Sequence, residues 1–152
     1  KLLVVLGLPG AGKSTFMDNL VLNGIVEKKS KHDDYYKDSL EGKQGVKRSR
    51  HYEALIENLR HEKTCTVSDI EFCNGIELQA LLDAISIELP KSPIIIDYIY
   101  FENNPEACKQ NVIARGKKET KRDVKDELQK IDRLTEIYKI PLNAKSLTVT
   151  RI

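Results

Sequence analysis

The chain has 152 residues and a formal net charge of +2, and 40% of its residues are hydrophobic. This size predicts one domain over residues 1–152. The net charge lacks the basic excess typical of nucleic-acid-binding domains, so binding to a nucleic acid would require a local basic patch. Three cysteines without C-x-x-C spacing argue against a disulfide framework and against a zinc site. No apolar run reaches the length of a membrane span and no signal peptide is visible, so we expect a cytoplasmic protein.

The first element in the chain is an apolar run over residues 2–6, which predicts a buried strand. Residues 7–14 follow as Gly-Leu-Pro-Gly-Ala-Gly-Lys-Ser and fit G-x-x-x-x-G-K-[ST], the phosphate-binding P-loop. A helix over residues 15–22 comes next, so backbone N–H groups and the helix dipole converge on one anion. We expect Lys13 to reach the β- and γ-phosphates of ATP and Ser14 to hold Mg²⁺. The residues expected to bind the nucleotide are Gly10, Ala11, Gly12, Lys13, Ser14 and Thr15.

The rest of the chain alternates apolar runs with helical periodicity, which predicts an α/β fold with a five-stranded, mainly parallel sheet between helices. The further strands are expected at residues 29–32, 64–68, 93–101 and 146–152. The further helices are expected at residues 49–61, 75–89, 105–115 and 123–138. Two segments are polar and basic: residues 42–48, expected as a loop, and residues 116–122, expected as a short lid. Such a three-layer domain that opens on a P-loop is of the kinase type, and its ligands collect beyond the carboxyl ends of the strands.

Acidic residues follow two of the expected strands at that edge. Asp33 and Asp34 come directly after the second strand, and either could take the proton of an acceptor hydroxyl, with Asp33 favoured. Asp69 follows the third strand, where it could hold Mg²⁺ through water or contact the acceptor. Acidic residues after a strand are also common as turn formers and helix caps, so a capping role for Asp69 stays open.

The candidate cations lie around the basic segment after the fourth strand. Arg115 is expected to close over the phosphates and to stabilise the transferred phosphoryl group, with Arg122 as a second such arginine. A solvated basic loop at a helix C-terminus is the alternative, because cations are favoured there in any case. Lys117, Lys118 and Lys121 are interpreted as solvated surface residues.

These motifs resemble the kinase domain of bacteriophage polynucleotide 5′-kinase, within the wider group of P-loop kinases. Residues 7–15 resemble that family's ATP loop, and the Asp-Asp-Tyr at residues 33–35 resembles its motif after strand two. The resemblance implies that Asp33 is the general base, that Asp69 contacts the acceptor end, and that Arg115 is the lid arginine. It also implies a 5′-hydroxyl end of DNA or RNA as acceptor.

Two positions depart from that family. Tyr36 stands where the family has an arginine for the acceptor phosphate, and Asn111 stands where a further lid-side arginine is expected. Lys37, or a basic residue of the segment 47–50, could take their place. A kinase for a nucleoside, nucleotide or metabolite therefore remains an alternative, and so does a regulatory NTPase, although no Asn-Lys-x-Asp signature is present.

Overall fold

The computed structural model describes residues 1–33, 44–119 and 123–150, and in the helix that begins at Gln44 it describes side chains from Tyr52 onward. Within these residues five strands form one sheet in the order β2-β3-β1-β4-β5, and every neighbouring pair is parallel. The strands are β1 Leu2–Leu6, β2 Lys31–His32, β3 Cys65–Ser68, β4 Ile96–Phe101 and β5 Lys145–Leu147. A parallel sheet places the carboxyl ends of all its strands at one edge, and this is the edge at which the site is predicted.

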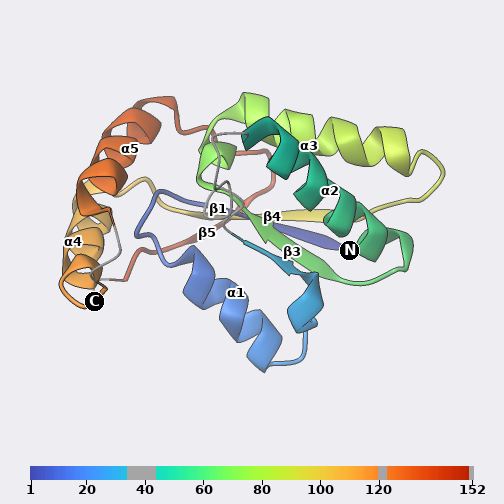
Figure 1. Cartoon of the computed structure of the whole chain (residues 1–152), viewed down its shortest axis with the longest axis horizontal. Coiled ribbons are helices and arrows are strands. Elements are labelled where there is room, and N and C mark those ends of the chain that lie inside the picture. Colours follow the sequence, from blue (N-terminus) through green and yellow to red (C-terminus); the bar gives the residue numbers. More distant parts are fainter. Residues whose placement is uncertain (34–43, 120–122, 151–152) are drawn as a thin grey trace.

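Helices cover both faces of this sheet, so the predicted three-layer α/β architecture is confirmed (Figure 1). The α-helices are α1 Lys13–Leu22, α2 Gln44–Arg60, α3 Gly75–Glu88, α4 Pro105–Gly116 and α5 Val124–Ile137. Two short 3₁₀ helices, η1 Lys28–Ser30 and η2 Ile70–Cys73, precede β2 and follow β3. In Figure 1, α2 and α3 lie above the sheet and α1 lies below it.

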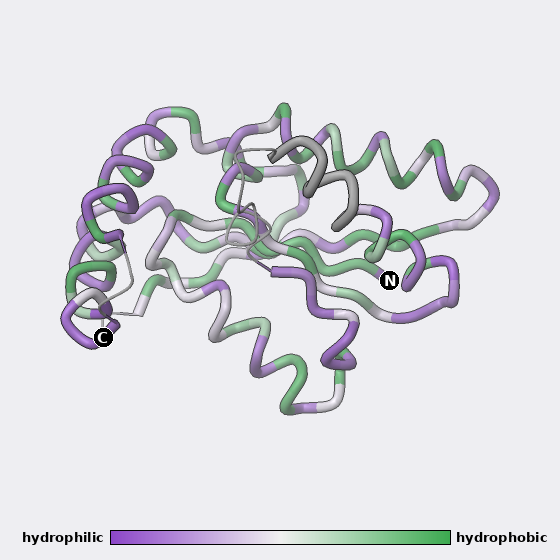
Figure 2. Tube along the Cα trace, viewed as in Figure 1, coloured by the Kyte–Doolittle hydropathy of each residue, from purple (hydrophilic) through white to green (hydrophobic). Residues whose placement is uncertain are grey.

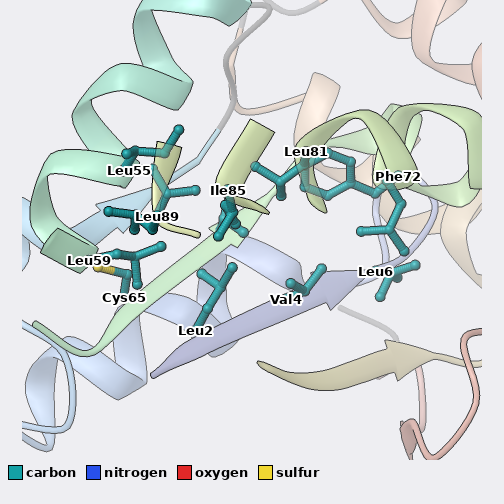
Figure 3. Packing of buried hydrophobic residues seen from close by; sticks show 13 residues of the cluster. Leu2, Val4, Leu6, Leu55, Leu59, Cys65, Phe72, Leu81, Ile85 and Leu89 are labelled. Atoms are coloured by element: carbon teal, nitrogen blue, oxygen red, sulfur yellow. The ribbon is translucent and has the colours of Figure 1, made fainter. Parts of the chain in front are cut away.

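The core consists of two hydrophobic clusters, one on each face. Leu2, Val4 and Leu6 of β1 pack against α2 and α3 in the first cluster (Figure 3). Val5 of the same strand faces the second cluster, which α1, α4 and α5 complete. Both faces of β1 are therefore buried, which explains its unbroken apolar sequence. Figure 2 shows the same distribution, with hydrophobic residues concentrated along the central strands.

Four predicted boundaries were wrong. The fourth strand begins at Ile96 instead of residue 93, and the other three differ for local reasons. The second strand covers only residues 31–32, because residues 28–30 form η1. The basic segment expected as a loop over residues 42–48 is helical from Gln44 onward, since its lysines and arginines are good helix formers. The last strand covers residues 145–147 instead of 146–152, because its partner β4 ends where Phe101 pairs with Leu147. Residues 151–152 lie outside the described residues.

Three further properties concern the residues that the structure describes. Across the ranges that the structure describes, no helix combines the length and apolar character needed to cross a membrane. The side chains of Cys65, Cys73 and Cys108 are free thiols and are buried, as the sequence predicted. The same ranges hold no group of three or more His, Cys, Asp or Glu side chains arranged to bind a metal ion.

Candidate active site at the carboxyl edge of the sheet

The glycine loop connects the end of β1 to the start of α1. Gly10 has φ +84° and Gly12 has φ +109°, values that side-chain-bearing residues rarely adopt. A Cβ atom at Gly10 would also lie 2.5 Å from the Cys108 carbonyl oxygen of α4. Gly12 is the N-cap of α1, and no side chain caps that helix. The first backbone N–H groups of α1 therefore face the loop, in the arrangement that binds phosphate.

The Lys13 side chain lies inside this loop and is only 8% exposed. Its ammonium group donates hydrogen bonds to the carbonyl oxygens of Gly7 at 2.8 Å and of Leu8 at 2.9 Å. Two carbonyl partners hold the buried charge at the end of β1. An anion bound by the helix N-terminus would meet this ammonium group directly.

Asp33 meets the loop from the neighbouring part of the sheet. It follows β2 directly, and its Oδ2 atom accepts a hydrogen bond of 2.7 Å from the Ser14 hydroxyl. The two residues are 19 positions apart, and the parallel sheet brings them together at one edge, as predicted. Asp34, the other candidate base, lies outside the described residues.

Asp69 follows β3 and is only 4% exposed. Its Oδ1 atom accepts a hydrogen bond of 2.9 Å from the Glu71 backbone N–H, so the side chain caps η2. The capping alternative is thus the contact that the structure shows, while roles in metal or acceptor binding remain predictions. β3 is fixed beside the loop, because Ser68 Oγ donates to the Val5 carbonyl at 2.9 Å.

The buried thiols of Cys73 and Cys108 lie beneath the loop, and nearby charges act on their pKa values. Burial raises the pKa of Cys73 to about 11, although the Lys13 charge and a hydrogen bond from the Gly7 backbone act in the opposite direction. Burial likewise raises the pKa of Cys108 to about 11, against the opposing charges of Lys13 and Arg115. Both thiols therefore stay protonated at neutral pH and serve as packing residues.

Arg115 lies in the last turn of α4, close enough for its charge to act on Cys108. This helix also packs against Gly10, so the structure places Arg115 and the glycine loop on the same side of the molecule. The helix ends at Gly116, where a Cβ atom would lie 2.2 Å from a methyl group of Val124 in the first turn of α5. The two ends of the basic segment are thus held together, while Arg122 itself lies outside the described residues.

Sequence reasoning missed the role of Asn111, which it treated as the replacement of an arginine. The side chain is 3% exposed, and its Nδ2 group donates to the Gly10 carbonyl and to the Thr150 carbonyl, each at 2.9 Å. The available signal was a polar residue on the face of α4 that otherwise carries Ala107, Cys108 and Val112. Asn111 therefore supports the loop from behind.

Phe101 was also missed and forms an aromatic wall of the loop. Its ring meets Phe16 edge to face, with ring centroids 6.4 Å apart, and lies under Gly12. The Tyr138 hydroxyl donates a hydrogen bond of 2.6 Å to the Phe101 carbonyl and anchors the end of β4 to the chain after α5. The sequence marked both aromatic residues only as parts of a strand and a helix.

Comparison with known proteins supports the fold. No family model matches the sequence, and a comparison with curated proteins found no significant match. Solved structures do match: a gluconokinase from Sinorhizobium meliloti has TM-score 0.61 at 13% identity, covering 99% of this chain and 83% of its own. A Chloroflexus aurantiacus protein named as a kinase has TM-score 0.63 at 13% identity, covering 97% of this chain and 83% of its own.

A third similar structure is Chaetomium thermophilum Kti12, which was solved in complex with ADP-AlF3. It has TM-score 0.56 at 18% identity, covering 97% of this chain and 89% of its own. These likenesses, together with the strand order and the glycine loop after β1, show that the chain has the fold of P-loop kinases.

Proposed function

We propose that this protein is an ATP-dependent phosphotransferase that moves the γ-phosphate of ATP to an acceptor hydroxyl, with the 5′-hydroxyl end of a polynucleotide as the leading acceptor. The observation that carries the proposal is the hydrogen bond between Ser14 and Asp33. A P-loop alone occurs in ATPases, GTPases and kinases. A carboxylate 2.7 Å from the loop hydroxyl adds the group that a hydroxyl acceptor requires.

The glycine loop forms the donor half of the proposed site. Backbone N–H groups at the start of α1 hold the phosphates, and the Lys13 ammonium exchanges its carbonyl partners for phosphate oxygens. Arg115 adds a second cation from the end of α4, and Arg122 of the basic segment is proposed to assist it. The proposed phosphate-binding residues are Gly10, Ala11, Gly12, Lys13, Ser14, Thr15 and Arg115.

Asp33 is proposed as the general base of the acceptor half. The acceptor oxygen forms a bond to the γ-phosphorus, the bond to the bridging oxygen of ATP breaks, and ADP leaves with that electron pair. The acceptor's proton passes to the Asp33 carboxylate. A carboxylate accepts several hydrogen bonds, so the bond from Ser14 is compatible with one from the acceptor. Asp34 and Asp69 are proposed to orient the acceptor.

The oxygen donors beside the loop fit Mg²⁺. The Ser14 hydroxyl and the Asp33 carboxylate are hard oxygen ligands at one point, and Asp69 is the acidic residue at the end of the adjacent strand β3. Ser14 would hold the ion directly, and Asp69 would orient its water molecules. The bound ion would supply positive charge against the β- and γ-phosphate oxygens.

A small-molecule hydroxyl is the second candidate acceptor, and the engagement of Asn111 favours it. Its amide hydrogens are bonded to two backbone carbonyls, and an amide supplies no positive charge for a phosphate on the acceptor. An acceptor that carries a hydroxyl without a neighbouring phosphate would need no such charge. The likeness to a gluconokinase agrees with this candidate at the level of the fold alone.

Labelled ATP tests these alternatives in one experiment. The protein is incubated with Mg²⁺, γ-labelled ATP and a panel of 5′-hydroxyl DNA, 5′-hydroxyl RNA, nucleosides and sugar acids, with Lys13→Ala as control. Label on the oligonucleotides supports the leading acceptor, and label on a small molecule alone supports the second candidate. ATP hydrolysis that no acceptor changes would overturn both and favour a regulatory NTPase.

A further inference from the structure

The Asn111 side chain makes a polar contact between α4 and the outer bend of the glycine loop. Nδ2 is one nitrogen with two hydrogens, and it donates to Gly10 O and to Thr150 O at 2.9 Å each. Gly10 is 101 positions away in sequence and Thr150 is 39 positions away. One buried amide thus joins the loop to the segment 148–150 that follows β5.

Gly10 is the loop residue whose carbonyl the Asn111 amide holds. It has φ +84°, and a glycine tolerates nearly any ψ, so on the Gly10 side nothing in the backbone opposes rotation of the peptide to Ala11. That peptide is trans, so its carbonyl and its N–H point to opposite sides. The carbonyl points outward to Asn111, and the Ala11 N–H points inward, where it donates to Leu8 O at 3.1 Å.

Rotation of this peptide would reverse the electrostatics of the loop. The Gly10 carbonyl oxygen would turn toward the side on which the phosphates are proposed to bind, and the Ala11 N–H would lose its bond to Leu8 O. The bond from Asn111 opposes the rotation, because the Gly10 carbonyl would lose its partner in a buried position. Contacts with Cys108 and Val112 limit the space on the same side.

The second hydrogen bond of Asn111 links the Gly10 peptide to the segment 148–150, which follows β5. Val149 is 5% exposed in the second hydrophobic cluster, and its N–H donates to Glu102 Oε1 at 3.4 Å. The neighbouring Thr150 carbonyl therefore has a fixed position against which the Asn111 amide is aligned. Displacement of the segment 148–150 would release one of the two bonds that orient the amide.

We propose that Asn111 is a positioning residue that latches the Gly10 peptide in its phosphate-binding orientation and makes nucleotide affinity depend on the docked segment 148–150. This inference rests on one part of the proposed function, namely that the glycine loop binds a nucleotide. It assigns Asn111 no contact with ATP or with the acceptor. Its consequence is a defect in nucleotide binding that exceeds any loss of overall stability.

Binding of ATP to Asn111→Leu tests the latch, because leucine has similar volume and no amide hydrogens. Thr66→Val is the matched control, since it also removes a buried side-chain hydrogen bond to a backbone carbonyl. The Thr66 hydroxyl donates to the Leu3 carbonyl at 3.1 Å within the sheet, away from the glycine loop's contact with α4. Calorimetry and initial rates should show that the Kd and the KM for ATP rise about tenfold to a hundredfold in Asn111→Leu, with a smaller change in kcat. Thr66→Val should lose a comparable amount of stability but keep the wild-type Kd and KM for ATP.

Equal ATP affinity in the wild type and Asn111→Leu would overturn the latch, and so would an equal rise of Kd in both variants. If the wild type binds no nucleotide, the proposed function fails instead. NMR of the labelled wild type adds a test that needs no variant. The Asn111 side-chain amide protons should exchange slowly with solvent and should shift when ADP is added, and rapid exchange without a shift would contradict the latch.

Discussion

Substitution of Gly10 by alanine tests the packing of the glycine loop against α4. The new Cβ atom would lie 2.5 Å from the Cys108 carbonyl oxygen and 3.0 Å from a methyl group of Val112. Real Cβ atoms essentially never approach another heavy atom within 3.0 Å, so the loop or α4 must move. Because the nearer neighbour is helix backbone, a side-chain rotation cannot relieve the contact.

The cost has two parts that can be estimated separately. An alanine at φ +84° costs about 1–2 kcal/mol relative to glycine, and overpacking a close contact costs about 1–3 kcal/mol. The sum of about 2–5 kcal/mol is a large share of the roughly 5–15 kcal/mol that stabilises a typical domain. Movement of the loop should also weaken ATP binding well beyond tenfold, since its N–H groups lose their common focus.

Gly24→Ala is the control for the conformational part. Gly24 has φ +72°, yet nothing lies within 4 Å of a Cβ atom at this position. In Gly24→Ala, urea unfolding should show a loss of about 1–2 kcal/mol of stability, and calorimetry should show unchanged ATP affinity. In Gly10→Ala, the loss of stability should be larger and ATP affinity should fall as well. Equal behaviour of the two variants would refute the role of the α4 contact.

Gly116→Ala should destabilise the protein by about 1–3 kcal/mol, because its Cβ would lie 2.2 Å from a Val124 methyl group, and Val124→Ala should restore most of that loss in a urea-unfolding cycle. Lys13→Ala should abolish phosphoryl transfer, measured with labelled ATP, because the loop then loses its buried ammonium. The two thiols of pKa about 11, against 9.0 for an ordinary thiol, should make stability fall as pH rises from 9 through 11, because the unfolded chain loses those protons first. Each thiol contributes a slope of up to about 1.4 kcal/mol per pH unit, so Cys108→Ala should show a smaller alkaline shift of the urea midpoint than the wild type.

Most of the architecture was predictable because its signals are local. The unbroken apolar run of β1 and the glycine pattern after it fix a buried strand followed by a loop and a helix. The end of β5 was not predictable, because it depends on where its partner β4 ends at Phe101. The helical start at Gln44 was not predicted, because the polar, basic and glycine-containing segment 42–48 is also typical of a loop, although its lysines and arginines favour a helix.

The candidate site divides in the same way. Ser14 and Asp33 could be brought together from the sequence, since Asp33 directly follows one predicted parallel strand and Ser14 follows the glycine loop at the end of another. The two bonds of Asn111 join positions 101 and 39 residues apart, and no local pattern encodes them. A capping role for Asp69 was one of the alternatives that the sequence left open, because choosing it requires the backbone of η2, a short 3₁₀ helix that the sequence did not indicate.

The central claim is that Asp33 serves as the base of a phosphoryl transfer on the glycine loop. Asp33→Asn keeps an oxygen that can accept the bond from Ser14 and removes the basicity and the negative charge of the carboxylate. Asp18→Asn is the matched control, because Asp18 forms a surface ion pair with Lys31, the residue before His32 in β2. Single-turnover transfer from labelled ATP to the acceptor identified by the panel is the measurement. The account predicts a loss of about 10²–10⁴-fold in Asp33→Asn with ATP affinity kept and no loss in Asp18→Asn, whereas a wild-type rate in Asp33→Asn would contradict it.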